Sequence, residues 1–351
     1  MAGEAASRPL EDVGPLGLEV VLADLRHGRS FTKPYVRFSL SDLDVRFEHQ
    51  GTRLVGVVRR PAGDGPHPAV AFVDGSGPAE RDSFEQEAEA LARAGFASLG
   101  WDKPGCGESG GDWRDQSLQD RASEALAAVA CLAAQEGVDP TRIALLGGSQ
   151  GGWVGPLAAS MSDGVAAVVS LSGPGVSPYD QEAYRVEHLL RDAGAPDDQV
   201  AEAMAFFHRR AARLRRGDDL DDVLAEQLGH REAPWYPALG DDGVVEHLAF
   251  MARIYDYDPV PVLERVTCPV LAIWGERDLY VPVAASVERF AAALGRAGNG
   301  SFRLEVVPDA DHGLRLPPTG EAERGPRIPD LMDMVIAWLR RALCPPAPGP
   351  G

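Results

Sequence analysis

The chain lacks the features of a membrane-spanning or secreted protein. It has no uninterrupted apolar run near the roughly 18 residues that a transmembrane helix needs. Its first residues, Met1 to Glu11, lack the basic patch followed by an apolar stretch that a secretory signal requires. We therefore expect a cytoplasmic protein that is not bound to a membrane.

Cysteine and positive charge are also scarce. The chain has only 4 cysteines, with no CxxC pair and no metal-ligand spacing, which is typical of reduced thiols and predicts no metal site. Acidic residues outnumber basic ones by 53 to 34, and the formal net charge is -19. Nucleic acids and anionic membranes bind cationic surfaces, so we expect neither as a partner. No Walker loop, HExxH or EF-hand is present, and no cofactor is expected.

Apolar segments alternate with helical segments over most of the chain. Residues 69–73 are continuously apolar, which is typical of a strand covered on both faces. Repeated strand–helix units predict an α/β fold, with a mostly parallel central sheet and helices on both faces. Further strands are expected at 96–100, 142–146, 165–171, 270–274 and 303–307, and helices at 83–94, 118–135, 152–161, 284–294 and 329–343. An antiparallel meander is expected before them, at 37–40, 43–47 and 54–58.

The strand–helix alternation is interrupted once. Residues 178–261 contain several helical segments and no convincing buried strand, which predicts a helical cap inserted between two strands of the sheet. The core is then expected in two parts, residues 1–177, which begin with a loose arm at 1–34, and residues 262–344. A Pro/Gly-rich tail at 345–351 is expected to be disordered.

The strongest local motif is Gly147-x-Ser149-x-Gly151, which lies between an apolar strand and a helix-forming stretch. This spacing is typical of a nucleophile elbow, in which a serine sits on a strained turn with its hydroxyl exposed. The residues two before and two after the serine must be small, so that strand and helix can approach each other. The N-terminus of the following helix offers free N–H groups to a developing anion.

A serine hydroxyl needs a base to become nucleophilic, and that base needs an orienting acid. Active groups in a parallel sheet lie at the carboxyl ends of strands. Asp278 follows the strand expected at 270–274, and His312 follows the strand at 303–307. We predict that Ser149, His312 and Asp278 form a catalytic triad, with Glu276 as an alternative acid. Activity should then fall in acid, as His312 becomes protonated.

These residues, with the segments 74–82 (DGSGPAERD) and 101–109 (WDKPGCGES), resemble those of α/β-hydrolase serine hydrolases. The similarity is to bacterial esterases, with acylaminoacyl-peptidase-like and dienelactone-hydrolase-like relatives. It implies an α/β-hydrolase fold with a helical cap and cleavage of a small or medium carboxylic ester, lactone or thioester through an acyl-enzyme. Acyl transfer and amide or peptide cleavage on the same scaffold stay open, as does a non-catalytic ligand-binding protein.

The resemblance also implies an oxyanion hole made of backbone N–H groups. Gln150 would supply one donor, and Ser76 or Gly75 the other. The family usually has His-Gly at this second place, whereas this chain has Asp74-Gly75. Because the donors are main-chain groups, the change affects the local hydrogen bonding and leaves the predicted triad intact.

Other residues are weaker candidates for a functional role. The run Gly105-x-Gly107-x-x-Gly110 matches a dinucleotide fingerprint formally, but no helix is expected to open on it. A histidine of the cap could touch a small acyl substrate. A cap of this size predicts an enclosed, mostly apolar pocket. The candidate wall residues are Trp153, Phe206, Phe207, Trp235, Tyr236 and Phe250, each of which could equally pack in the cap or core.

Overall fold

The structure, a computed structural model, describes residues 22–24, 29–31, 41–240, 243–319 and 324–344. The chain divides into two compact units, Met1–Ser39 and Leu40–Gly351. In the first unit, strand β1 (Leu22–Asp24) pairs antiparallel with β2 (Arg29–Phe31). The rest of the expected N-terminal arm, the strand expected at 37–40 and the C-terminal tail lie outside the described residues.

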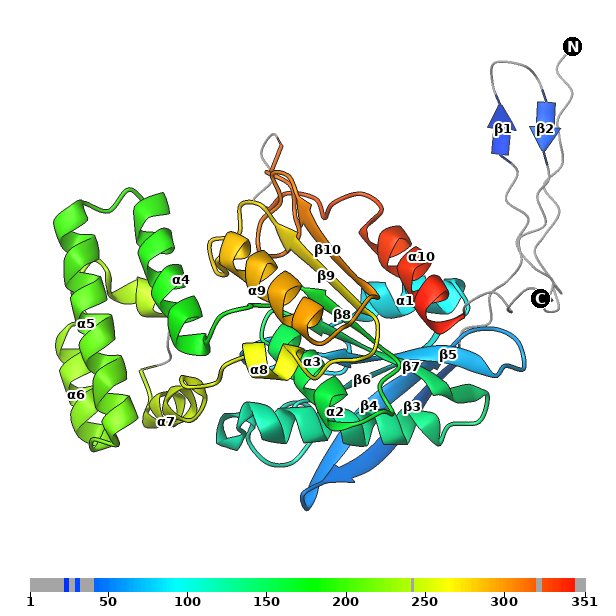
Figure 1. The fold of residues 1–351 in the computed structure, drawn as a ribbon, viewed down its shortest axis with the longest axis horizontal. Helices are drawn as coiled ribbons and strands as arrows, with labels where there is room; N and C mark the ends of the chain where they lie inside the picture. Colours follow the sequence, from blue (N-terminus) through cyan, green and yellow to red (C-terminus); the bar gives the residue numbers. More distant parts are fainter. Residues whose placement is uncertain (1–21, 25–28, 32–40, 241–242, 320–323, 345–351) are drawn as a thin grey trace, which may run out of the picture. The chain divides into compact units, whose positions relative to one another are not determined.

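The second unit is built on an eight-stranded sheet, in the order β10-β9-β8-β7-β5-β6-β4-β3 (Figure 1). The strands from β10 to β6 in this order are parallel to one another, whereas β4 is antiparallel to both β6 and β3. The mostly parallel sheet predicted from the sequence is therefore confirmed. The strands are β3 (Ser41–His49), β4 (Thr52–Arg60), β5 (His67–Val73), β6 (Ala97–Trp101), β7 (Val138–Gly148), β8 (Ala167–Leu171), β9 (Val270–Gly275) and β10 (Phe302–Val307).

Helices cover both faces of this sheet because the central strands are apolar on both sides. On β5, Val70 and Phe72 pack with residues of α1 and α10, while Ala69 and Val73 belong to the core under α2, α3, α8 and α9. Alternate side chains of a strand point to opposite faces, so one apolar run supplies both cores. The helices are α1 (Glu85–Arg93), α2 (Leu118–Ala133), α3 (Gly151–Met161), α8 (Val260–Leu263), α9 (Val283–Arg296) and α10 (Leu331–Leu343).

The strand order reverses between β5 and β7, and this reversal determines where a ligand site can form. The chain passes from β5 to β6 on one side, then crosses back to β7 on the other side of β5. In the ladder Val73 lies opposite Gly147, so the loops after β5 and β7 begin side by side. Open α/β sheets bind ligands in the crevice at such a switch point.

Helix α2 starts at a capping box that fixes its first turn. The Ser117 hydroxyl accepts from the N–H of Asp120 at 3.1 Å, and the Asp120 carboxylate accepts from the N–H of Ser117 at 2.9 Å. This exchange satisfies two backbone donors that the helix itself cannot pair. It also sets the place of Arg121, the next residue, beneath the loop after β5.

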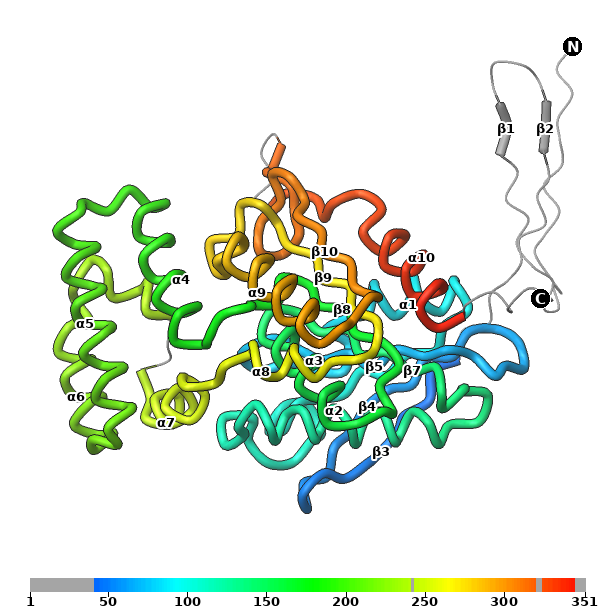
Figure 2. Tube along the Cα trace, in the orientation of Figure 1, coloured from blue at the N-terminus to red at the C-terminus, as the bar shows by residue number. Residues whose placement is uncertain are grey.

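Between β8 and β9 the chain forms a helical insert, which we define as α4 (Pro178–Asp192), α5 (Asp197–Arg216), α6 (Leu220–Gly229), the 3-10 helix η2 (Tyr236–Leu239) and α7 (Val245–Ile254). The described residues of this stretch contain no strand. Figures 1 and 2 show the insert, in green and yellow-green, beside the layered core. Its helices pack on an apolar cluster of their own, which includes Val186, Phe206, Phe207 and Trp235. None of the described helices is long and apolar enough to cross a membrane.

Candidate active site

Ser149 occupies the tight turn between β7 and α3. Its φ is +52°, a left-handed conformation that costs a non-glycine residue strain. A Cβ at Gly147 would lie 2.3 Å from the Gly151 carbonyl oxygen, and one at Gly151 would lie 2.2 Å from the Val73 oxygen. Only glycine fits at these two positions, as the elbow motif predicts. The Ser149 N–H donates to the Leu171 carbonyl at 2.8 Å, which anchors the turn to β8.

Asp278 lies in the loop after β9, and its carboxylate is buried, with the residue 2% exposed. Oδ1 accepts from the N–H groups of Tyr280 at 2.7 Å and Val281 at 2.9 Å. Oδ2 therefore remains for a third partner, and it lies 2.8 Å from His312 Nδ1. The backbone of the Asp278 loop thus determines which carboxylate oxygen faces the histidine.

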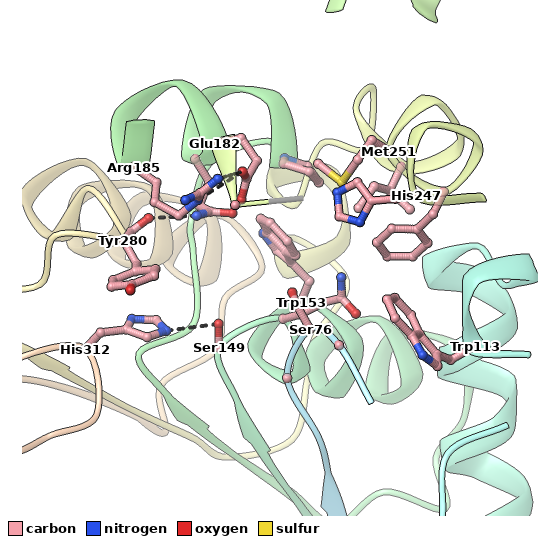
Figure 3. Close-up of a pocket in the computed structure, with 18 of the residues that line it drawn as sticks. Ser76, Trp113, Ser149, Trp153, Glu182, Arg185, His247, Met251, Tyr280 and His312 are labelled. Carbon is pink, nitrogen blue, oxygen red and sulfur yellow. Dashed lines mark hydrogen bonds and ion pairs between the residues drawn. The ribbon is translucent and has the colours of Figure 1, made fainter. Parts of the chain in front are cut away.

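His312 follows β10 and is held on both sides. The Ser172 hydroxyl donates to its carbonyl at 2.8 Å, and the Tyr280 ring stacks on its imidazole with centroids 4.9 Å apart. His312 Nε2 lies 3.1 Å from Ser149 Oγ (Figure 3). Because the Asp278 carboxylate can only accept, Nδ1 carries the proton and Nε2 is free to accept from the serine. The structure thus brings the three residues predicted from the sequence into one hydrogen-bonded row.

Main-chain N–H groups from two loops lie next to this row. In the described part of the chain, the N–H groups of Gln150 and Ser76 donate to no other backbone group. Gly75 packs close to the serine, since a Cβ there would lie 3.3 Å from Ser149 Cβ and 3.3 Å from the Gly148 oxygen. A side chain at position 75 would therefore crowd the space in front of Ser149.

Three charged side chains lie behind these N–H groups. Asp74 is partly buried, and this burial raises the pKa of its carboxyl to about 6, against opposing effects of Arg121 and Lys103. Burial, together with the charge of Arg121, lowers the pKa of Lys103 well below its usual range. Burial likewise lowers the pKa of Arg121, which the charge of Glu124 partly offsets.

A cavity of about 670 Å³ opens at Ser149 and His312. Its walls come from the core and from the insert, and Figure 3 shows Trp113, Trp153 and Met251 around it. Two of the predicted wall residues, Trp153 and Phe250, line it. The cap histidine that touches it is His247, from α7.

The remaining four predicted wall residues do not line this cavity, and the prediction was wrong for them. Phe206, Phe207 and Trp235 are at most 1% exposed in the core of the insert, and Tyr236 packs against that core. These aromatic side chains hold the helices of the insert to one another. The wall is also less apolar than predicted, because Glu182 and Arg185 of α4 line it.

A second, smaller cavity of about 210 Å³ also reaches Ser149 and His312. Its other walls come from different elements, among them Phe84 before α1, Leu171 at the end of β8 and Leu331 of α10. The serine hydroxyl therefore adjoins two separate spaces of unequal size.

The weaker candidates of the sequence have structural roles. Glu276 accepts from the N–H of Asp309 at 3.1 Å and makes no described bond to His312. Gly105 donates to the Gly110 carbonyl at 2.9 Å, so the glycine run closes on itself as a turn and opens no helix. No group of three or more His, Cys, Asp or Glu among the described residues is placed to hold a metal ion.

Sequence reasoning did not identify several residues of the site. Tyr280 lies two residues after Asp278, and that closeness was the available signal. Lys103 lies inside the segment 101–109 that carried the resemblance. Arg121 had no sequence signal, because it lies on a helix and reaches the site only through the fold.

The fold and the site define the class of protein. The solved structure of 2,6-dihydroxy-pseudo-oxynicotine hydrolase superposes with a TM-score of 0.55 at 20% identity, over 86% of this chain and 68% of that chain. An esterase of Pyrococcus furiosus superposes with a TM-score of 0.54 at 17% identity, over 87% of this chain and 92% of that one. This chain therefore has the α/β-hydrolase fold, as the resemblance implied.

The sequence comparisons identify the family. The profile of the X-Pro dipeptidyl-peptidases (S15 family) matches residues 50–308, and the chain belongs to this family. It is also 27% identical over 301 residues to esterase EstD of Thermotoga maritima, an alignment that covers 82% of this chain. The chain spans 65% of the length of that esterase.

Proposed function

We propose that this protein is a serine hydrolase that cleaves a small or medium carboxylic ester through an acyl-enzyme. The observation that carries the proposal is the hydrogen-bonded row from Ser149 Oγ to His312 Nε2 at 3.1 Å and from His312 Nδ1 to Asp278 Oδ2 at 2.8 Å. An alcohol, an imidazole and a buried carboxylate in this order can move a proton away from the alcohol as it attacks.

The reaction follows from these contacts. His312 Nε2 takes the Ser149 proton while Oγ bonds to the ester carbonyl carbon, and Asp278 stabilises the imidazolium. The N–H groups of Gln150 and Ser76 donate to the carbonyl oxygen as it gains negative charge. Breaking the ester bond releases the alcohol, which takes the proton from His312. Water then attacks the acyl-enzyme carbonyl with His312 as base. The bond from the acyl carbon to Ser149 Oγ breaks, the carboxylic acid leaves, and His312 returns the proton to Ser149.

The two cavities support a substrate with unequal halves. The larger, about 670 Å³, is within the usual range for small-molecule sites and carries aromatic walls such as Trp153 and Phe250. The smaller, about 210 Å³, has room for a short alkyl or alkoxy group beside Ser149. Both open on the serine, so the two groups on a scissile carbonyl would each have a separate space.

Peptide cleavage is the second candidate, because the chain belongs to a family described as X-Pro dipeptidyl-peptidases. Glu182 in the cavity wall could attract the amino group of a peptide. Its Oε2, however, already accepts from Arg185 at 2.7 Å and 3.0 Å, which neutralises much of its charge. This pairing favours an uncharged ester over a cationic dipeptide.

A fluorophosphonate probe tests the proposed function directly. The folded protein should be labelled, and Ser149→Ala should abolish both the labelling and the ester hydrolysis. A non-catalytic binding protein would fold, bind ligand and remain unlabelled. A panel of p-nitrophenyl esters, a thioester and an X-Pro p-nitroanilide then ranks the candidates by kcat/KM. A higher kcat/KM for the anilide than for every ester would make peptide cleavage the first candidate and ester hydrolysis the second.

A further inference from the structure

Two basic side chains are buried directly behind the loop that follows β5. Lys103, one of only two lysines in the chain, is 1% exposed, and Arg121 of α2 is 3% exposed. Burying one charged side chain costs several kcal/mol unless partners compensate it. Two such side chains beside one loop therefore need a specific explanation, which the catalytic row itself does not supply.

Both side chains donate to main-chain oxygens of that loop. Lys103 Nζ donates to the carbonyl oxygens of Gly75 at 3.1 Å and Gly77 at 2.5 Å. Arg121 Nη2 donates to the Asp74 oxygen at 2.8 Å, and Nη1 to the Gly75 oxygen at 3.3 Å. The Gly75 oxygen is thus held from two directions by the Lys103 nitrogen and the Arg121 guanidinium.

The geometry of the peptide bond connects these contacts to catalysis. The Gly75 carbonyl and the Ser76 N–H belong to one planar trans peptide, so they point in opposite directions. A carbonyl fixed toward Lys103 and Arg121 turns the Ser76 N–H away from them. The hydrogen bonds that the Gly75 oxygen accepts from Lys103 and Arg121 also polarise this peptide group, which makes the Ser76 N–H a stronger donor.

Arg121 also reaches the other proposed donor. Its Nη1 donates to the side-chain oxygen of Gln150, the residue whose N–H follows Ser149. One guanidinium therefore binds both the loop after β5 and the turn after β7. Because the two donors come from loops far apart in sequence, a shared partner fixes the distance between them.

We infer that Lys103 and Arg121 are positioning residues of the oxyanion hole, which orient the Ser76 N–H and hold it in register with Gln150. This inference rests on the proposed serine hydrolase function. Two carboxylates, one partly buried and one buried, offset the positive charge. Asp74 lies beside the two basic side chains, and Glu124 accepts from Trp101 Nε1 at 2.8 Å and from Gln116 Nε2 at 2.6 Å one turn along α2 from Arg121.

The test compares Lys103→Met, Arg121→Met and Arg121→Lys in the full chain, with kcat expressed per fluorophosphonate-labelled serine. Removal of a whole oxyanion donor lowers kcat by about 10²- to 10³-fold, which is the upper limit for misorienting one. We expect kcat to fall about 100-fold in Arg121→Met and about 10-fold in Lys103→Met, with KM changed by less than about threefold. Arg121→Lys should recover part of the loss in kcat, because a lysine keeps the positive charge but cannot bind both loops at once.

A trifluoromethyl ketone that matches the ester gives the second readout. It forms a tetrahedral oxyanion on Ser149, so its inhibition constant should rise by the same factor as kcat/KM falls. Arg289→Met, at an exposed arginine of α9, is the matched control and should retain wild-type kcat.

If Lys103 and Arg121 had a purely structural role, replacing them would reduce the thermal midpoint and the fraction of labelled protein. It would leave kcat per labelled serine and the affinity for the ketone unchanged. That result in any folded variant of Lys103 or Arg121 overturns the inference. If Arg121→Met does not fold, the same measurements on Lys103→Met and Arg121→Lys test the inference. A wild-type protein that is neither labelled nor active would instead refute the proposed hydrolase, which separates the two failures.

Discussion

Replacing Asp278 by asparagine should reverse the direction of one hydrogen bond and so disable the proposed base. Oδ1 of Asp278 accepts from the N–H groups of Tyr280 and Val281. The oxygen of an asparagine must keep that place, which leaves its NH₂ group facing His312 Nδ1. The imidazole would then have to accept at Nδ1 and carry its proton on Nε2, toward Ser149. A protonated Nε2 cannot take the serine proton.

The size of the effect follows from this geometry. With the wrong tautomer fixed by two backbone N–H groups, kcat should fall about 10⁴-fold, or about 5.5 kcal/mol of barrier. KM should change by less than about threefold, because the side chain is buried away from the cavity. The assay is p-nitrophenyl ester hydrolysis in Asp278→Asn, with thermal unfolding as a check on folding.

Asp309→Asn provides the matched control. Asp309 is an exposed aspartate of the neighbouring loop that pairs with Arg277 at 3.2 Å, and its replacement should leave kcat within about twofold. A folded Asp278→Asn protein with kcat within tenfold of wild type would show that this carboxylate does not set the tautomer, and the reasoning would fail.

Three further predictions concern stability and binding. The pKa of Asp74, raised to about 6 from 3.8, means that the folded state binds this proton more tightly than the unfolded state. The contribution of Asp74 to stability should therefore fall by about 2 kcal/mol as pH rises from 4 to 6, and urea unfolding of Asp74→Asn should lack this fall. Gly152→Ala would place a Cβ 2.3 Å from Gly173 Cα and should lower the free energy of unfolding by roughly 3 kcal/mol. Gly295→Ala, which has open space around it, should raise the free energy of unfolding by up to about 1 kcal/mol. Equal thermal midpoints of the two variants would contradict this prediction. Phe250→Ala should raise KM for a bulky aryl ester about tenfold with little change for an acetate, and a parallel change in both would place Phe250 outside the substrate's reach.

The sequence was sufficient to predict the sheet and the three residues of the row. Ser149, Asp278 and His312 each follow an apolar strand, and parallel strands bring their carboxyl ends to one edge. Strand ends were predicted less well. β7 begins at Val138 and not near Arg142, because His67 N–H binds the Gly137 carbonyl at 2.7 Å and extends the ladder through residues that look like a turn.

The cavity wall and the buried cations could not be predicted in the same way. Phe206 and Phe250 are both aromatic residues of insert helices, and composition does not show which of the two faces a neighbouring helix and which faces a cavity. Arg121 has the sequence environment of a surface arginine on an amphipathic helix. Its burial depends on where the loop after β5 passes, which is a property of the assembled fold.

The insert joins the core only between β8 and β9, yet it supplies much of the wall of the larger cavity, including Glu182 and Phe250. The serine, the imidazole and the carboxylate all come from loops at sheet strands instead. In the proposed hydrolase, the residues that break the bond and much of the wall that contacts the substrate would therefore be encoded in different parts of the gene. Exchange of this single segment between relatives would then alter the wall of the larger cavity and leave the three residues of the row in place.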